Sequence, residues 1–336
     1  MLNPTRRTEG ARARRPPVIA PLLLTMAWLL MAPEPVAGWG PATHIALGET
    51  ILSSLYLLPP AIQAVLARYP LHFLYGSVAA DISFAKKYVP EGRHSHGWRV
   101  GKEILAGAES DQLLATGYGY LAHLAADTIA HNVFVPRQLL LTSTTQALGH
   151  TYWEHRMDMH VGEDFLSLAR HVVMDHDHSQ ADALLDDVLS HTLFSFKTNR
   201  RISRGMIRFA AHERWQQVFG KVLSNSRFDL PDPLVDRYFE VAFEYVVGYL
   251  RERDASPAAD LDPVGEMNLR LAKKVRRRAM SDPSADHPEV LQEMADVFFA
   301  FPSAELQYWP LIEDPLFTGG ITSTVGAAGR SLPELS

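Results

Sequence analysis

Apolar residues recur at intervals of three and four along most of the chain, a spacing that places them on one face of an α-helix. Alternation of apolar and polar residues, the pattern of a half-buried strand, is scarce. The sequence therefore predicts an all-α fold. The helical pattern covers residues 42–57, 97–107, 111–134, 145–160, 204–223, 232–252, 262–279 and 287–300.

Prolines and acidic residues mark the ends of these segments. Pro59-Pro60 and Pro70 interrupt the helical pattern, because proline is disfavoured inside a helix. Asp111 and Asp232 stand where N-cap residues are expected, since a carboxylate can accept hydrogen bonds from the first N–H groups of a helix. Residues 303–336 are rich in Pro, Gly, Ser and Thr, and we expect an extended or disordered tail there.

Two of the predicted helices carry polar residues four positions apart. These are His123, Asp127 and His131 on one helix, in an otherwise mostly apolar and small stretch, and His150 and Glu154 on the next. Residues four apart lie on the same side of a helix, so each group can direct an imidazole and a carboxylate at one cation. Zinc suits such ligands better than calcium or magnesium does. A metal-free network of hydrogen-bonded His and Asp is the alternative.

The first 38 residues have the pattern of an export signal. The basic stretch MLNPTRRTEGARARR precedes an apolar stretch that is shorter than the roughly 20 residues of a transmembrane helix. Val36-Ala37-Gly38 then supplies the small residues that a signal peptidase accepts. We expect a signal peptide at 1–38 and a periplasmic or secreted protein. An uncleaved signal that anchors the protein in a membrane is the alternative.

Composition limits the chemistry and the partners of the chain. It contains no cysteine, so neither a lipoprotein attachment site nor a disulfide can form. Without residues 1–38 there are 27 basic and 36 acidic residues, which gives a formal charge of −9. An acidic surface disfavours avid binding to phosphate backbones, so no stable nucleic-acid partner is expected.

Further candidate ligands lie outside the two helices. Cleavage after Gly38 would make Trp39 the first residue, whose α-amine and carbonyl can chelate a metal, and His44 follows five residues later. Asp81 lies in GSVAADISF and His96 in HSHGW. Together with the two helical groups, these residues resemble the zinc-dependent phospholipase C family. That family is related to secreted single-strand-specific zinc nucleases and to glycosylphosphatidylinositol-specific phospholipase D.

The resemblance implies a multi-helix, phospholipase C or nuclease-like domain with three zinc ions. Asp81 matches the acidic residue that is either a metal ligand or the proposed general base in the family. The implied ligands are His96, His123 and Asp127 for one zinc, Trp39, His44 and a shared Asp127 for its neighbour, and His131, His150 and Glu154 for the third.

The chain departs from the bacterial phospholipase C pattern in one spacing. Three residues rather than five separate Asp127 from His131, which is more like the glycosylphosphatidylinositol-specific phospholipase D branch. His94 also competes with His96 as a ligand. We prefer His96, because Ser95-His96 followed by the aromatic Trp98 looks more like the family's pattern.

Three other polar groups allow two interpretations each. Residues 175–178, Asp-His-Asp-His, are an extra metal site or, as we expect, a solvated turn. His155, Asp158 and His160 either orient the ligands or form the exposed face of their helix. The basic run 273–278 is a contact for anionic lipid or, as we expect, a solvated helix end.

From the ligand set we expect an exported zinc-dependent phosphodiesterase of the phospholipase C type. Two to three zinc ions would activate water and polarise the phosphoryl group of a phospholipid or other phosphodiester, with transient contact to a membrane surface. Asp81 would orient the water or take its proton. A secreted zinc nuclease or nucleotidase, and a non-catalytic zinc-binding envelope protein, are the alternatives. We expect the metal-binding domain at 39–200 and a helical C-terminal extension at 201–302.

Overall fold

The structure, a computed structural model, describes residues 39–82, 92–142, 146–189, 196–210, 217, 220, 228 and 230–312. Every regular element in these residues is helical, which confirms the predicted all-α fold. The predicted signal peptide and residues 313–336 of the predicted tail lie outside the described residues. Among the helices that the structure describes, none is both long and apolar enough to cross a membrane.

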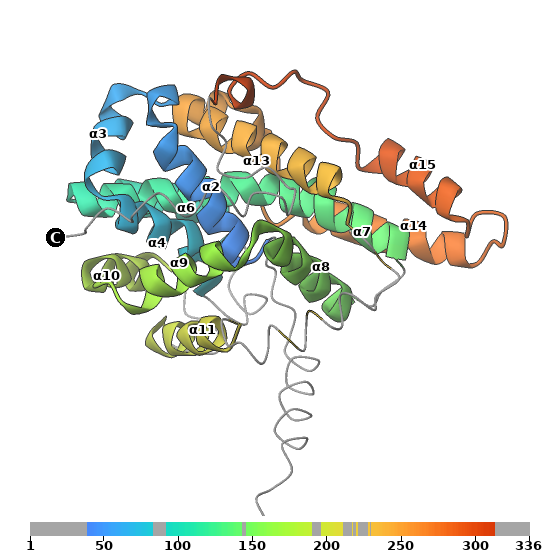
Figure 1. The fold of residues 1–336 in the computed structure, drawn as a ribbon, viewed down its shortest axis with the longest axis horizontal. Helices are drawn as coiled ribbons and strands as arrows, with labels where there is room; N and C mark the ends of the chain where they lie inside the picture. Colours follow the sequence, from blue (N-terminus) through green and yellow to red (C-terminus); the bar gives the residue numbers. More distant parts are fainter. Residues whose placement is uncertain are drawn as a thin grey trace, which may run out of the picture. The chain divides into compact units, whose positions relative to one another are not determined.

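Figure 1 shows how the described helices are arranged. In chain order, the α-helices are α2 (Pro41–Ser53), α3 (Pro60–Arg68), α4 (Pro70–Ala79), α5 (Trp98–Ala106), α6 (Asp111–Ile129), α7 (Val135–Thr142), α8 (Gln146–Val161), α9 (Glu163–Met174), α10 (Ser179–Val188), α11 (Phe196–Ala210), α13 (Asp232–Glu252), α14 (Glu266–Met280) and α15 (Pro288–Phe298). The shorter turns are η1 (Leu55–Leu57), η2 (Ala80–Ile82), η4 (Ala130–Phe134), η5 (Arg253–Ala255), η6 (Pro257–Asp260) and η7 (Trp309–Leu311).

Helix α6 runs through the core. It packs against α3, α4, α5 and α13, and Figure 1 shows it in one nearly continuous run with η4 and α7. From Ala115 to its end, every residue except Tyr118 is buried. Small residues such as Gly117 and Ala122 allow neighbouring helices to approach from several sides. Polar side chains on α6 are therefore removed from water and need partners within the protein.

Two glycines allow α4 and α6 to cross in close contact. A Cβ atom at Gly76 would lie 2.1 Å from the carbonyl oxygen of Thr116, and one at Gly119 would lie 2.0 Å from that of Phe73. Both obstacles are backbone atoms, so no side-chain rotation can relieve the overlap. The crossing therefore requires glycine at both positions, and it fixes α4 against the helix that carries the candidate ligands.

The structure corrects both predicted N-caps. Ser110, rather than Asp111, caps α6, because the Ser110 hydroxyl accepts a hydrogen bond from the N–H of Leu113 at 3.3 Å. Asp111 is instead the first residue inside the helix. In α13 the N-cap is Pro231 and Asp232 is the first helical residue. An acidic residue in the first turn still interacts favourably with the positive end of the helix dipole.

Helices α3, α4, α7, α9 and α10 are absent from the predicted set. Pro60 and Pro70 begin α3 and α4, because the first helical position does not need the N–H that proline lacks. They therefore start helices where the sequence suggested interruptions. Residues Phe73–Ala79 of α4 are all buried, so this helix has no polar face and no amphipathic pattern to detect.

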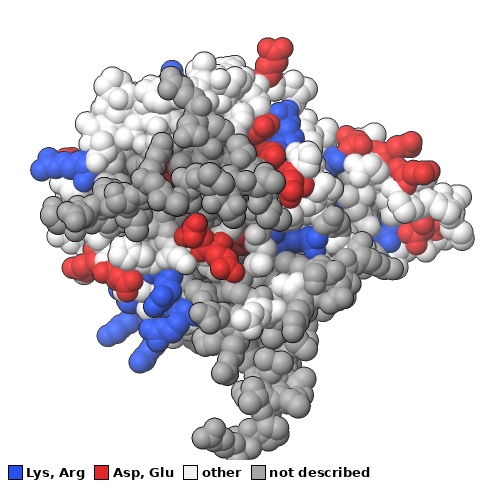
Figure 2. All heavy atoms as spheres, viewed as in Figure 1, with Lys and Arg blue, Asp and Glu red and all other residues white. Residues whose placement is uncertain are grey.

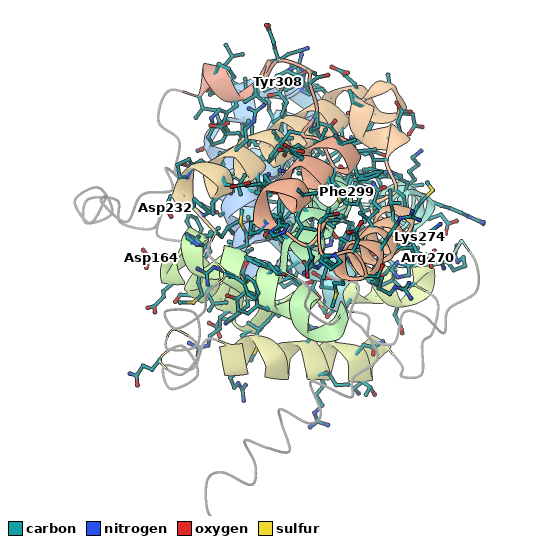
Figure 3. The ribbon with its side chains drawn as sticks, turned by 90° about the vertical axis from the view of Figure 1, so that its right-hand side faces the viewer. Asp164, Asp232, Arg270, Lys274, Phe299 and Tyr308 are labelled. Atoms are coloured by element: carbon teal, nitrogen blue, oxygen red, sulfur yellow. The ribbon has the colours of Figure 1, made fainter. Side chains whose placement is uncertain are left out.

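The C-terminal helices pack onto the same core. Helix α13 lies against α6, and α14 and α15 lie against α7, while α11 runs across the predicted domain boundary at residue 200. The buried residues of α14 are Leu269, Ala272 and Ala279. Arg270 and Lys274 lie on its outer side, where both are exposed (Figure 3). The basic run of α14 thus includes cations in contact with solvent.

We expect Gly119→Ala to lower the free energy of unfolding by about 1–3 kcal/mol or more, the usual cost of adding atoms to a packed core. Urea unfolding measures this change. Gly205→Ala on α11 is the control, because a Cβ atom there meets nothing within 4 Å and alanine is the better helix former. Equal stability of Gly119→Ala and the wild type would contradict the close crossing.

Candidate metal centre

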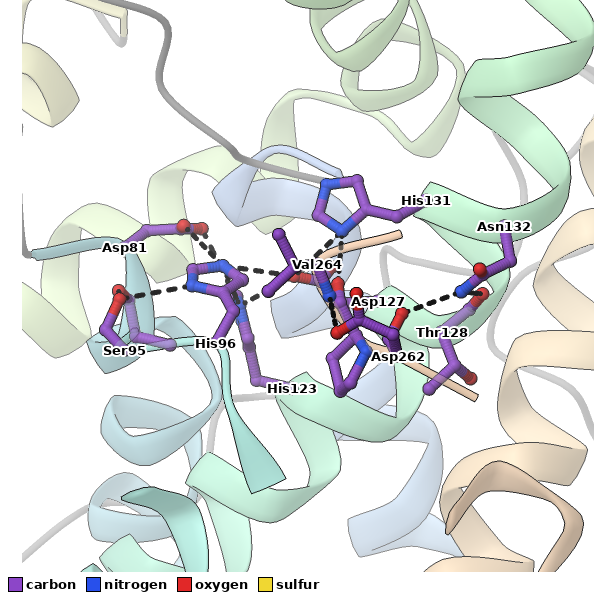
Figure 4. Close-up of polar contacts among 12 residues, drawn as sticks. Asp81, Ser95, His96, His123, Asp127, Thr128, His131, Asn132, Asp262 and Val264 are labelled. Atoms are coloured by element: carbon purple, nitrogen blue, oxygen red, sulfur yellow. Dashed lines mark hydrogen bonds and ion pairs between the residues drawn. The ribbon is translucent and has the colours of Figure 1, made fainter. Parts of the chain in front are cut away.

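Four parts of the chain bring imidazoles and carboxylates together in one cluster (Figure 4). Helix α6 contributes His123 and Asp127, α2 contributes His44, η2 contributes Asp81, and the loop before α5 contributes His96. We call these five residues the His/Asp cluster. The side chain of Asp81 is 26% exposed, whereas the other four are at most 1% exposed. The cluster is thus buried, with one carboxylate that reaches solvent.

The carboxylate of Asp127 lies at the centre of the cluster. Its Oδ2 atom is 3.1 Å from Nε2 of both His96 and His123. Its Oδ1 atom is 3.4 Å from Nε2 of His44. Asp81 Oδ1 lies 3.1 Å from the same Nε2 atom of His96. The two oxygens of Asp127 therefore face different ligand groups, as a carboxylate that bridges two cations must do.

Hydrogen bonds on the outer side of the rings orient two of the imidazoles. His123 Nδ1 donates to the carbonyl oxygen of Ser77 at 2.8 Å, since a carbonyl can only accept. The Ser95 hydroxyl donates to the carbonyl of Ala80 and so accepts from His96 Nδ1 at 3.2 Å. In these tautomers both Nε2 atoms present lone pairs, and they face each other at 3.1 Å.

This arrangement of lone pairs fits a bound cation. The two oxygens of Asp127 and Nε2 of His44 are buried, yet they make no hydrogen bond with any described residue. Ligand atoms about 2.0–2.1 Å from a tetrahedral zinc ion lie roughly 3.4 Å apart. The separations of 3.1–3.4 Å in the cluster are close to that value. Two overlapping groups have the required geometry: His44, His123 and Asp127, and Asp81, His96 and His123.

Electrostatic interactions keep the central carboxylate ionised. Burial opposes its ionisation, but the rings of His123 and His131 hold the pKa of Asp127 well below its usual range. Burial also disfavours a charged His123, yet the carboxylates of Asp127 and Asp81 outweigh it and raise the pKa of His123. For His44, burial and the neighbouring His123 ring lower the pKa. The neutral ring is therefore favoured at His44, and the protonated ring is favoured at His123.

The turn η4, which is π-helical, sets the position of His131. It follows α6 directly, so the regular α-helical spacing ends just before this residue. His131 Nδ1 donates to the carbonyl oxygen of Pro263 at 2.5 Å and lies 3.9 Å from Asp127 Oδ2. His131 is thus buried beside the His/Asp cluster and linked to the loop before α14. Its other ring nitrogen is the candidate ligand atom.

The remaining predicted ligands lie at the start of α2 and on α8. Trp39 is fully buried, with its ring centroid 6.1 Å from that of Phe134. Glu154 is buried on α8, which packs against α2. His150 lies one turn earlier on α8, but its side chain is outside the described part of the chain. The predicted third ligand group, His131 with His150 and Glu154, therefore stays a prediction.

Asp158 joins α8 to the first turn of α2. Its carboxylate accepts hydrogen bonds from the N–H groups of Ala42 and Thr43, at 3.3 and 3.0 Å, and from the Thr43 hydroxyl at 2.7 Å. Burial raises the pKa of Asp158 to about 6, against the effect of these hydrogen bonds. A Cβ atom at Gly40 would lie 2.1 Å from Asp158 Oδ2. The sequence left Asp158 either as a residue that orients the ligands or as part of an exposed helix face. Its burial fits the orienting role, because its hydrogen bonds hold the start of α2, the helix that carries His44.

His94 and His160 are not part of the His/Asp cluster, and each has another contact. The Nδ1 atom of His94 accepts a hydrogen bond from the backbone N–H of His96 at 3.1 Å. In the described residues, the groups with cation-binding geometry include His96 and not His94. The Nδ1 atom of His160 lies 3.1 Å from the carboxylate of Asp232 at the start of α13.

Comparison with known proteins identifies one family. A family model described as zinc dependent phospholipase C matches residues 43–210, which is half of the 336 residues. The matched region begins one residue before His44 and contains every predicted ligand except Trp39. No curated protein and no solved structure matches the chain.

We expect Asp127→Asn to remove more than one equivalent of zinc per chain, because the two oxygens of Asp127 face different ligand groups. Elemental analysis of the purified, metal-replete protein measures the zinc content. Asp111→Asn is the control, since Asp111 is an exposed carboxylate on the same helix. Full zinc content in Asp127→Asn would contradict the bridging role, and a wild type without zinc would contradict the metal centre itself.

Proposed function

Because the chain belongs to the zinc-dependent phospholipase C family, we propose that it is an exported phosphodiesterase that hydrolyses the head-group phosphodiester bond of phospholipids. The products would be diacylglycerol and a phosphorylated head group. The observation that carries the proposal is the buried His/Asp cluster, which lies within the matched region and reaches solvent through Asp81. The proposed cofactor is two to three zinc ions.

The residues of the cluster suit phosphodiester hydrolysis. Bound zinc would lower the pKa of an attacking water and polarise the phosphoryl oxygens. Asp81, 26% exposed, can orient that water or accept its proton at the carboxylate. Ser77 and Ser95 hold the rings of His123 and His96, so these ligands need no reorganisation when substrate arrives.

The surface near Asp81 supports an anionic substrate at a lipid interface. Helix α11 packs against η2, the turn that carries Asp81. Its exposed cations include Lys197, Arg201 and Arg208, and Figure 2 shows basic side chains gathered over this helix. Cations close to a membrane surface attract lipid phosphates. We therefore propose that α11 takes part in a transient contact with the phospholipid surface.

A substrate panel tests the proposed function. The metal-replete protein without residues 1–38 is incubated with phosphatidylcholine, phosphatidylinositol, single-stranded DNA and a p-nitrophenyl phosphodiester. We expect release of a phosphorylated head group from phospholipid, and loss of this activity with a zinc chelator. Hydrolysis of DNA alone would support the nuclease alternative. No hydrolysis of any substrate by zinc-loaded protein would support the non-catalytic alternative.

We expect Asp81→Asn to lower the turnover number for the phosphodiester by about 100-fold or more, the usual scale for removal of a general base. It should retain most of the zinc, because the four buried residues of the cluster stay in place. Turnover and zinc content are measured on the same sample. The exposed carboxylate of Asp164 on α9 provides the control variant, Asp164→Asn. Parallel loss of zinc and activity would make Asp81 a ligand instead.

We expect the exported protein to begin at Trp39, because only a free amine at that position can bind metal beside His44. N-terminal sequencing of exported protein checks this. Protein expressed with one extra Met before Trp39 should lose zinc selectively and lose activity, whereas protein cleaved to start at Trp39 should keep both. Full zinc content and turnover with the extra Met would mean that Trp39 serves only to pack against Phe134.

A further inference from the structure

Three histidines meet at a second place, outside the His/Asp cluster. His72 lies on α4, and His176 and His178 lie in the turn between α9 and α10. One ring nitrogen from each lies within 4.8 Å of those of the other two. The ring centroids are 4.6–5.4 Å apart. Because α4 packs against α9, the fold brings together residues that are far apart in the sequence.

The surroundings of His178 present one of its nitrogens as a ligand atom. The residue is 1% exposed, and its Nε2 atom donates to the carbonyl oxygen of Val172 at 2.8 Å. Its Nδ1 atom is buried and makes no hydrogen bond with any described residue. Tyr75 stacks on the ring, with centroids 3.8 Å apart and an interplanar angle of 6°, which fixes the ring plane. Burial lowers the pKa of His178 to about 3, so the Nδ1 lone pair is available at neutral pH.

The other two rings complete the group. His176 Nδ1 donates to the carbonyl oxygen of Asp177 at 3.0 Å, which leaves the lone pair on Nε2. Donation of the second ring N–H to a carbonyl is usual for a metal-binding histidine. The imidazole of His72 makes edge contacts with both His176 and His178, and its ring nitrogens make no hydrogen bond with a described residue. Both His72 and His176 are partly exposed, so their rings have room to rotate.

The nearby carboxylates already have partners in the local turn. Asp177 accepts hydrogen bonds from the N–H and the hydroxyl of Ser179, at 2.9 and 3.3 Å. Asp175 lies 3.3 Å from the ring of His171. The two aspartates are exposed, as the expectation of a solvated turn requires. His176 and His178 instead lie against His72 of α4. The buried Nδ1 atom of His178 has no hydrogen-bond donor among the described residues there, and a bound cation would satisfy its lone pair.

We propose that His72, His176 and His178 form a second metal site, which binds one zinc or similar divalent transition-metal ion through three imidazoles. Imidazole suits such ions, and water would occupy the fourth position from the solvent side. Nitrogen ligands about 2.0–2.1 Å from zinc lie roughly 3.4 Å apart, so rotation of the two partly exposed rings must bring the nitrogens closer. The ion joins α4 to the turn between α9 and α10 and shares no residue with the His/Asp cluster.

Zinc titration of the metal-free protein tests this site. We compare the wild type with His72→Ala and His176→Ala, whose partly exposed side chains can be removed without opening the core. Each variant should bind one equivalent less, or bind that equivalent at least about 100-fold more weakly, since loss of a ligand exceeds the 10–100-fold effect of outer partners. Zinc should also raise the Tm of the wild type more than that of either variant.

Two controls separate this site from other zinc binding. His171→Ala removes an exposed histidine of α9 that lies outside the three-histidine group, and it should match the wild type. Asp127→Asn, which disrupts the His/Asp cluster, should keep the equivalent that His72→Ala and His176→Ala lose. Zinc content and affinity identical to the wild type in both variants, or an equal loss in His171→Ala, would overturn the proposal.

Discussion

The approach of three imidazoles to the buried carboxylate of Asp127 is the interaction on which the arrangement of the helices depends. An ionised carboxylate without partners is very costly in an apolar core, whereas one surrounded by cationic or metal-binding groups is tolerated. His44, His96 and His123 come from three separate segments, so α2, the loop before α5 and α6 must converge on one point. The packing of these helices and the geometry of the candidate metal centre therefore depend on each other.

Backbone contacts between α4 and α6 then fix the positions of the residues around Asp127. The glycines at the crossing of α4 and α6 bring the two backbones together, and the carbonyl of Ser77 on α4 holds the ring of His123 on α6. A small displacement of α4 would move both the orienting carbonyl and Asp81, which follows the helix. The proposed three-histidine site involves the same helix through His72. The position of α4 thus affects both groups of ligands.

The ligand groups that share one helix could be predicted from the sequence. The contacts that depend on how the helices pack could not. His123 and Asp127 were recognisable because the α-helix places residues four apart on one side. His131 was recognisable by the same spacing, but it lies within a π-helical turn, whose altered position no helical period predicts. Ser77 acts through a backbone carbonyl that any residue could supply. His72 meets His178 only after α4 and α9 have packed, so the sequence showed two of the three histidines as a polar turn and gave no link to His72.

The contact between Gly40 and Asp158 has a consequence for how the N-terminal sequence can evolve. Any side chain at position 40 would overlap the carboxylate that accepts hydrogen bonds from the first turn of α2. Under the proposed processing, the same residue stands second in the exported protein, directly after the newly formed amine of Trp39. The signal peptidase would bind this short stretch while it is unfolded. After folding, the same stretch must fit against Asp158. A substitution at position 40 must therefore permit both cleavage and folding. One that improved cleavage but added a side chain would be selected against because it disrupts the folded domain.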